Sequence, residues 1–231
     1  MKTSTSAPKG KGLLSKTLSS EWFERIHHFF IWKLLFGCRL IGHERIPEGV
    51  TVIFAGNHVS HYDMFFLVTV FKLVSGKTRK RVIPVAWEGI RSFPILGTLY
   101  DYYNCISVSE EKPGNALKKM VRVLKSGHDI HVQCEGGVNR VLGTFQNGAA
   151  IASLKSGSPI VPFSLCGAHD LFPNMMWPDR YWGNVSIILH DPIYPQEYLE
   201  KYDDLRTAAE YMTSDLRAAV ASRIDYPDGE A

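Results

Sequence analysis

The chain has 231 residues, of which 45% are hydrophobic and 21% are charged, and its formal net charge is +3. This balance is that of one globular domain with a substantial core, and it excludes a disordered or collagen-like chain. The charge is uneven: residues 1–50 carry eight Lys or Arg and four Asp or Glu, whereas residues 197–231 carry four and nine. A basic front end is typical of a protein that meets an anionic surface.

We expect two segments in the first part of the chain, a basic arm and a helix. Residues 1–19 are rich in Ser, Thr, Lys and Gly, which indicates a flexible basic arm without the apolar core of a secretory signal. Residues 20–40 predict an amphipathic helix, because Phe23, Ile26, Phe30 and Leu34 recur at helical spacing. Lys33 interrupts its apolar stretch, which is shorter than the roughly twenty residues that a membrane-spanning helix needs. The helix can therefore lie on a membrane surface as an interfacial helix, or it can pack on the rest of the domain. We expect a single domain that spans residues 20–231.

Apolar runs of strand length alternate with helical periodicity along the rest of the chain. The predicted strands are 51–56, Val82–Ala86, Ile130–Cys134, Ile160–Leu165 and Val185–Leu189. The predicted helices begin at Met64 or span Ala116–Lys125, Gly148–Lys155 and Asp204–Ile224. This alternation predicts an α/β fold with a mostly parallel central sheet flanked by helices.

A histidine and an aspartate five residues apart follow the first of these strands. His58 and Asp63 lie between the strand at 51–56 and the helix that begins at Met64, at the kind of edge where sites collect in α/β proteins. An imidazole can take a proton from a hydroxyl or an amine near neutral pH, and a carboxylate can fix its tautomer. The pair is a candidate general base with its orienting group, although the same spacing also occurs between surface or core residues.

Other classes of site have little support in the sequence. Cys38, Cys105, Cys134 and Cys166 are widely separated, which predicts free thiols that act as small apolar fillers in a reducing compartment. No His or Cys pattern has the spacing of a zinc site, and no Walker or dinucleotide-binding glycine pattern occurs. We therefore expect no metal, no cofactor and no nucleic-acid partner.

Four blocks of the chain occur in the order that characterises one family of enzymes. They are Asn57-His58-x4-Asp63; Phe93–Gly97 followed by Ile106–Val108; Gln133-Cys134-Glu135-Gly136-Gly137; and Phe145–Ala149 followed by Ser158–Phe163. The first is similar to the Asn-His-x4-Asp motif of the glycerolipid (lysophospholipid) acyltransferases. The third resembles the block that in this family usually reads Phe-Pro-Glu-Gly-Thr-Arg. The resemblance covers residues 20–195, most of the chain.

The resemblance implies transfer of a fatty acyl group from an acyl-CoA or acyl-carrier-protein thioester to a hydroxyl or amine of a lipid-like acceptor. In that scheme His58 deprotonates the acceptor and Asp63 holds His58. The resemblance also implies a peripheral position on the cytoplasmic face of the membrane. Further residues expected to bind substrate are Asn57, Glu135, Gly136, Gly137 and Arg140.

Two arginines of the family pattern are missing or displaced. Glu110 stands where the second block usually ends in arginine, and Arg140 lies two residues later than the arginine of the third block. Arginine suits phosphate because its planar fork donates two hydrogen bonds. We therefore expect an acceptor other than ordinary lysophosphatidic acid. The alternatives are a 1-acylglycerol-3-phosphate acyltransferase of phospholipid synthesis and a non-catalytic, membrane-peripheral lipid-binding protein.

Overall fold

The computed structural model describes residues 37–61, 63–74, 82–109, 111, 113–171 and 184–225. The arm expected at 1–19, most of the helix expected at 20–40, and Glu110 lie outside the described residues. The last two residues of that expected helix belong instead to a short strand, β1 (Arg39–Ile41), because they pair with β7 (Ser186–Leu189). In the described ranges, no helix has the length and apolar character required to cross a membrane.

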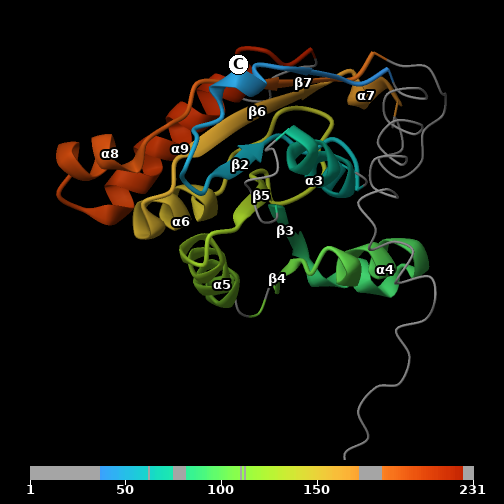
Figure 1. Cartoon of the computed structure of the whole chain (residues 1–231), viewed down its shortest axis with the longest axis horizontal. Coiled ribbons are helices and arrows are strands. Elements are labelled where there is room, and N and C mark those ends of the chain that lie inside the picture. The colour runs from blue at the N-terminus through green and yellow to red at the C-terminus, as the bar shows by residue number, and fades with distance from the viewer. Residues whose placement is uncertain are drawn as a thin grey trace, which may run out of the picture.

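The centre of the described part is one seven-stranded sheet in the order β1-β7-β6-β2-β5-β3-β4 (Figure 1). Its other strands are β2 (Ile53–Gly56), β3 (Val82–Trp87), β4 (Ile106–Val108), β5 (Asp129–Gln133) and β6 (Ile160–Cys166). Neighbouring strands are parallel except for β6 and β7. The prediction of an α/β fold with a mostly parallel sheet is therefore confirmed.

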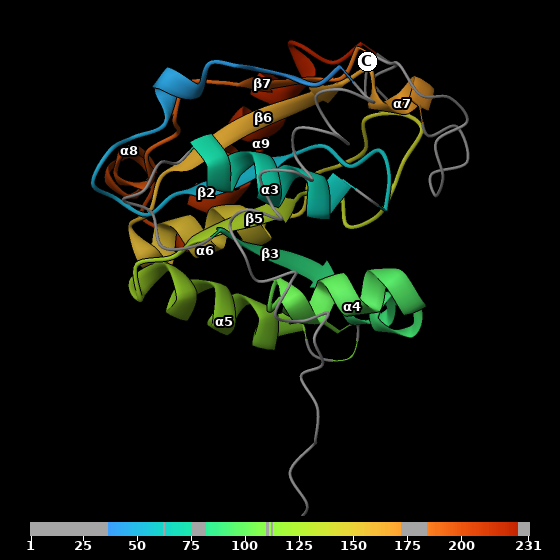
Figure 2. The same cartoon turned by 45° about the vertical axis from the view of Figure 1, so that its right-hand side comes forward.

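Helices cover both faces of this sheet (Figures 1 and 2). The α-helices are α3 (Asp63–Val74), α4 (Pro94–Tyr102), α5 (Pro113–Lys125), α6 (Gly148–Ser156), α7 (Ala168–Leu171), α8 (Pro195–Lys201) and α9 (Leu205–Ala221), and the short 3-10 helices are η2 (His43–Arg45) and η3 (Glu88–Ser92). Helix α3 lies on one face, whereas α5, α6 and α9 pack on the other. Helices α4 and α8 lie at opposite ends of the molecule in both views.

The central strands are buried on both faces, as is typical of parallel strands between helix layers. In β2, the side chain of Ile53 packs with α5, α6 and α9, while the next residue, Phe54, packs with α3. The ring of Phe54 stacks on Phe71 of α3, with 4.2 Å between the ring centroids. This two-sided core fixes the position of β2, and therefore of the segment that follows it.

The end of β2 is fastened to β6 by backbone and side-chain contacts. A Cβ atom on Gly56 would lie 2.1 Å from the carbonyl oxygen of Phe163, so only glycine fits between these strands. The side chain of Asn57, which is 0% exposed, donates to the Leu165 carbonyl at 2.9 Å and accepts from the Leu165 N–H at 2.8 Å. These contacts set the point at which the chain leaves the sheet.

A buried histidine lies in the core on the α3 face. The ring of His131 in β5 packs against Phe71 and Phe163, and neither of its nitrogens has a hydrogen-bond partner among the described residues. Burial, and to a lesser extent the nearby His58, lowers the pKa of His131 from 6.5 to about 3. The ring is therefore neutral in the folded protein over most of the acidic range.

This histidine predicts acid sensitivity of the fold. Between pH 6.5 and about 3 the unfolded chain binds a proton at His131 that the folded chain does not bind, so stability falls as the pH falls. Replacing His131→Leu should remove this contribution. From about pH 7 to pH 5, the free energy of unfolding in urea should fall by roughly 2 kcal/mol less in the variant than in the wild type. The exposed His43→Asn should behave as wild type, and equal pH slopes in His131→Leu and wild type would contradict the assignment.

Candidate active site

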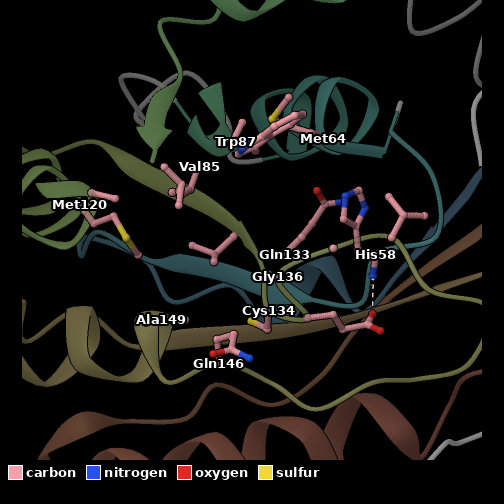
Figure 3. Close-up of a pocket in the computed structure, with 18 of the residues that line it drawn as sticks. His58, Met64, Val85, Trp87, Met120, Gln133, Cys134, Gly136, Gln146 and Ala149 are labelled. Carbon is pink, nitrogen blue, oxygen red and sulfur yellow. Dashed lines mark hydrogen bonds between the residues drawn. The ribbon is translucent and has the colours of Figure 1, made fainter. Parts of the chain in front are cut away.

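His58 follows the end of β2 and is held at three points. Its backbone N–H donates to Oε1 of Glu135 at 2.7 Å, the bond drawn as a dashed line in Figure 3. Its carbonyl accepts from the N–H of Asn139 at 3.3 Å, and its ring Nδ1 lies 3.3 Å from Oδ2 of Asp63. Because Nδ1 is engaged by the carboxylate, Nε2 is the nitrogen available to a substrate.

Asp63 is the first residue of α3 and is 2% exposed. Besides the His58 ring, its Oδ2 accepts from the N–H groups of Val59 at 2.6 Å and Ser60 at 2.7 Å. These donors and the positive end of the helix dipole compensate for the burial of the carboxylate. One carboxylate thus fixes the loop backbone and the imidazole together. The structure brings His58 and Asp63 together as the sequence analysis expected, and their catalytic roles stay predictions.

Glu135 connects the His58 loop to a second loop. While Oε1 holds the His58 N–H, Oε2 accepts from the N–H of Gly143 at 2.8 Å and from the side chain of Asn139 at 3.2 Å. Burial raises the pKa of this carboxyl, and the hydrogen bonds partly offset that effect. Glu135 was expected to bind substrate. Both of its oxygens are bonded to the protein and the residue also lines the cavity, so a role in binding substrate stays a prediction beside a role in positioning His58.

A cavity of about 730 Å³ lies beside His58, and its size is typical of a small-molecule site. Figure 3 shows His58 and Gln133 toward one end of the cavity and Met120 and Val85 toward the other. The lining comes chiefly from β3, α5, the end of β5 with the loop that follows it, and the start of α6, with single residues from α3, η3 and β4. The apolar side chains in this lining include Met64, Val85, Trp87, Ile90, Leu117 and Met120. The arrangement can hold an apolar chain with its polar end next to a histidine.

The other expected substrate-binding residues have different positions. Gly136, with a left-handed φ of 72°, and Gly137 line the cavity. The amide of Asn57 is buried against Leu165 and does not line it. Arg140 is exposed and does not line the cavity. Among the described residues, no other Lys or Arg lines it. Arg140 follows Asn139, whose N–H binds the His58 carbonyl, so it lies at the edge of the site.

The cavity is also lined by His61, Gln133, Gln146 and Asn147, none of which was among the residues expected to be catalytic or to bind substrate. The ring of His61 stands edge-on to that of His58, 6.3 Å between centroids, and burial followed by the proximity of His58 lowers its pKa. Gln133 lies at the end of β5. The signal of its role in the sequence was a polar residue at the position where the third motif block of the acyltransferases usually has phenylalanine.

Cys134 follows Gln133 and is buried. Burial, and then the neighbouring Glu135, raises the pKa of the Cys134 thiol to about 12. This thiol is therefore not available as a nucleophilic thiolate near neutral pH. The expectation that Cys134 packs in the interior is confirmed. Within the described ranges, no group of His, Cys, Asp and Glu side chains is arranged to hold a metal ion.

Comparison with known proteins gives consistent matches over most of the chain. The family model described as Acyltransferase matches residues 38–166. A 1-acyl-sn-glycerol-3-phosphate acyltransferase of Haemophilus influenzae is 27% identical, over 88% of this chain and 79% of its own. A chloroplastic protein of the same name from Arabidopsis thaliana is 25% identical over 88% of this chain and 56% of its own. The chain thus spans about half the length of this plant relative and of a similar one from Brassica napus.

A solved structure has the same fold. The crystal structure of the 1-acyl-sn-glycerophosphate acyltransferase of Thermotoga maritima matches with a TM-score of 0.64 and 22% identity, over 90% of this chain and 79% of that chain. At this identity the likeness concerns the arrangement of helices and strands.

The two possible roles of Glu135 predict different kinetics. Glu135→Ala leaves the N–H groups of His58 and Gly143 without their acceptor, and displacement of His58 should lower kcat by about 10²-fold with little change in the KM for either substrate. Glu135→Gln retains an acceptor for one of the two groups and should lose less. Steady-state kinetics check this result, with Glu200→Ala on the surface of α8 as the control. A raised KM for the acceptor at unchanged kcat would instead make Glu135 a substrate-binding residue.

Proposed function

Because the chain belongs to the acyltransferase family, we propose that it moves a fatty acyl group from an acyl-CoA or acyl-carrier-protein thioester to the free hydroxyl of a 1-acylglycerol 3-phosphate. One observation carries the proposal: a histidine oriented by a buried carboxylate lies at the end of an apolar cavity. The relatives named after this acceptor favour it over the phosphate-free acceptor that the displaced arginines suggested.

The proposed reaction needs no nucleophile from the protein. Nε2 of His58 takes the proton of the acceptor hydroxyl while that oxygen attacks the thioester carbonyl carbon. The resulting imidazolium is stabilised by Asp63, whose carboxylate faces Nδ1. When the tetrahedral intermediate collapses, the carbon–sulfur bond breaks and the leaving thiolate receives the proton from His58. The products are the new ester and the free thiol.

Arg140 is the proposed partner of the acceptor phosphate. The acyl chain of the donor suits the apolar cavity, which contains no described Lys or Arg, so the phosphate is expected at the edge of the site. Arg140 is exposed at that edge, one residue after the amide that binds the His58 carbonyl. A guanidinium there can donate two hydrogen bonds to a phosphate, although it occurs later in the sequence than the family pattern has it.

The proposed acceptor is an amphipathic lipid, which supports a peripheral position at a membrane surface. The basic front end of the chain favours attraction to anionic lipid, and we propose the cytoplasmic face as its location. The interfacial helix proposed for this contact falls largely on residues outside the described ranges.

The function is tested by supplying a radiolabelled palmitoyl donor, as palmitoyl-CoA and as palmitoyl-carrier protein, with 1-oleoylglycerol 3-phosphate in detergent micelles. We expect labelled phosphatidic acid as the product. His58→Ala should lose at least about 10³-fold in kcat because the general base is absent. Product formation by His58→Ala at the wild-type rate would reassign the base, and no product with either donor would reject the proposed reaction.

Parallel assays with 1-oleoylglycerol, which lacks the phosphate, test the acceptor. Wild type should use the phosphorylated acceptor with the higher kcat/KM. Arg140→Ala should lower this preference by about tenfold through the KM for the acceptor, and Arg140→Lys should retain part of it. Preference of the wild type for 1-oleoylglycerol would restore the phosphate-free acceptor, and an unchanged preference in Arg140→Ala would exclude this residue as the phosphate partner.

A further inference from the structure

Gln133 lines the wall of the cavity on the same side of the sheet as His58. Side chains alternate along a strand, so Gln133 shares the α3 face with His131, which packs on Phe71 of that helix. Figure 3 shows the side chains of Gln133 and His58 extending into the same part of the cavity. The amide therefore lies where the reacting end of a substrate must come to meet Nε2 of His58.

The amide nitrogen of Gln133 is buried and has no hydrogen-bond partner among the described residues. A buried donor left in this state costs about 1–3 kcal/mol of folding free energy, so such groups need an explanation. The third motif block usually has phenylalanine here, and phenylalanine would carry no such cost. A polar group without a protein partner, inside a ligand cavity, is explained if its partner is the substrate.

We propose that Gln133 is a catalytic residue that donates a hydrogen bond to the thioester carbonyl oxygen and to the oxyanion that forms from it. This inference rests on the proposed acyl transfer. When the acceptor oxygen attacks the carbonyl carbon, the carbonyl π electrons move to that oxygen and its negative charge grows, so a fixed N–H donor stabilises the transition state more than the bound substrate. The amide gives up no proton. The proton still passes from the acceptor to His58 and then to the departing thiolate.

The carbonyl oxygen is a better partner for this amide than the acceptor phosphate. The cavity around Gln133 contains no described Lys or Arg, and a dianionic phosphate held by one neutral amide would be poorly compensated. A thioester carbonyl is neutral before the reaction and becomes charged only while His58 beside it carries the acceptor's proton. A single neutral donor suits that change.

The test compares Gln133→Met, which keeps the length of the side chain and removes the donor, with wild type. Palmitoyl-CoA and 1-oleoylglycerol 3-phosphate are the substrates. We expect kcat to fall by about 10²-fold, while the KM for each substrate stays within about threefold. The affinity for S-hexadecyl-coenzyme A, a thioether without the carbonyl, should not change in calorimetry. The Tm should not fall, because the substitution removes an unpartnered buried group.

Gln196→Met, the same change on the exposed surface of α8, is the matched control and should retain wild-type kinetics. Gln133→Glu, which presents an acceptor to the oxyanion, should lose at least as much kcat as Gln133→Met. Active wild type with an equally active Gln133→Met would overturn this inference alone. A raised acceptor KM at unchanged kcat would also overturn it, because Gln133 would then bind the ground state. Wild type without transfer from either donor would overturn the proposed function and this inference together.

Discussion

The buried carboxylate of Asp63 determines the conformation on which the site depends. Three groups of the preceding segment converge on its Oδ2: the N–H groups of Val59 and Ser60 and the ring Nδ1 of His58. A loop that leaves a strand and enters a helix would otherwise have many conformations, and fixing each residue costs about 1–2 kcal/mol. Here helix α3 begins at Asp63 and strand β2 ends just before Asn57 and His58. Both elements pack in the core, so the loop between them is fixed at both ends.

Parallel strands explain why distant parts of the chain meet at this loop. Strands β2 and β5 are neighbours with the same direction, so their carboxyl ends lie side by side. The backbone of His58 and the carboxylate of Glu135 are 77 residues apart in sequence and 2.7 Å apart in space. The same edge receives Gln133 from the end of β5. The sheet thus brings the imidazole of His58, the carboxylate of Glu135 and the amide of Gln133 to one end of an apolar cavity, as expected for a ligand site in an open α/β sheet.

Much of this architecture follows from the sequence, because buried strands and amphipathic helices have clear periodicities. Two three-residue strands, β1 and β4, are too short to show one, and β1 exists through its pairing with β7. The His58–Asp63 pair was accessible because both residues lie in one local motif. The hydrogen bonds of Glu135 could not be predicted from the sequence, since they depend on contacts between loops far apart in the chain. The expectation of a phosphate-free acceptor relied on Glu110 and Arg140 and where they stand in the motif blocks. Spacing along the chain does not tell how far a side chain reaches in space.

The role proposed for Asp63 is to hold the imidazole of His58 with its proton on Nδ1, leaving Nε2 unprotonated toward the cavity. Long-range ¹H–¹⁵N NMR correlation spectra of the free protein, with the ring signals assigned by their loss in His58→Ala, report this tautomer directly. In the neutral ring we expect a protonated Nδ1 and an unprotonated Nε2, and a mixture of tautomers in Asp63→Ala. A wild-type ring protonated on Nε2 would contradict this role, since that nitrogen could not accept the proton of an incoming hydroxyl.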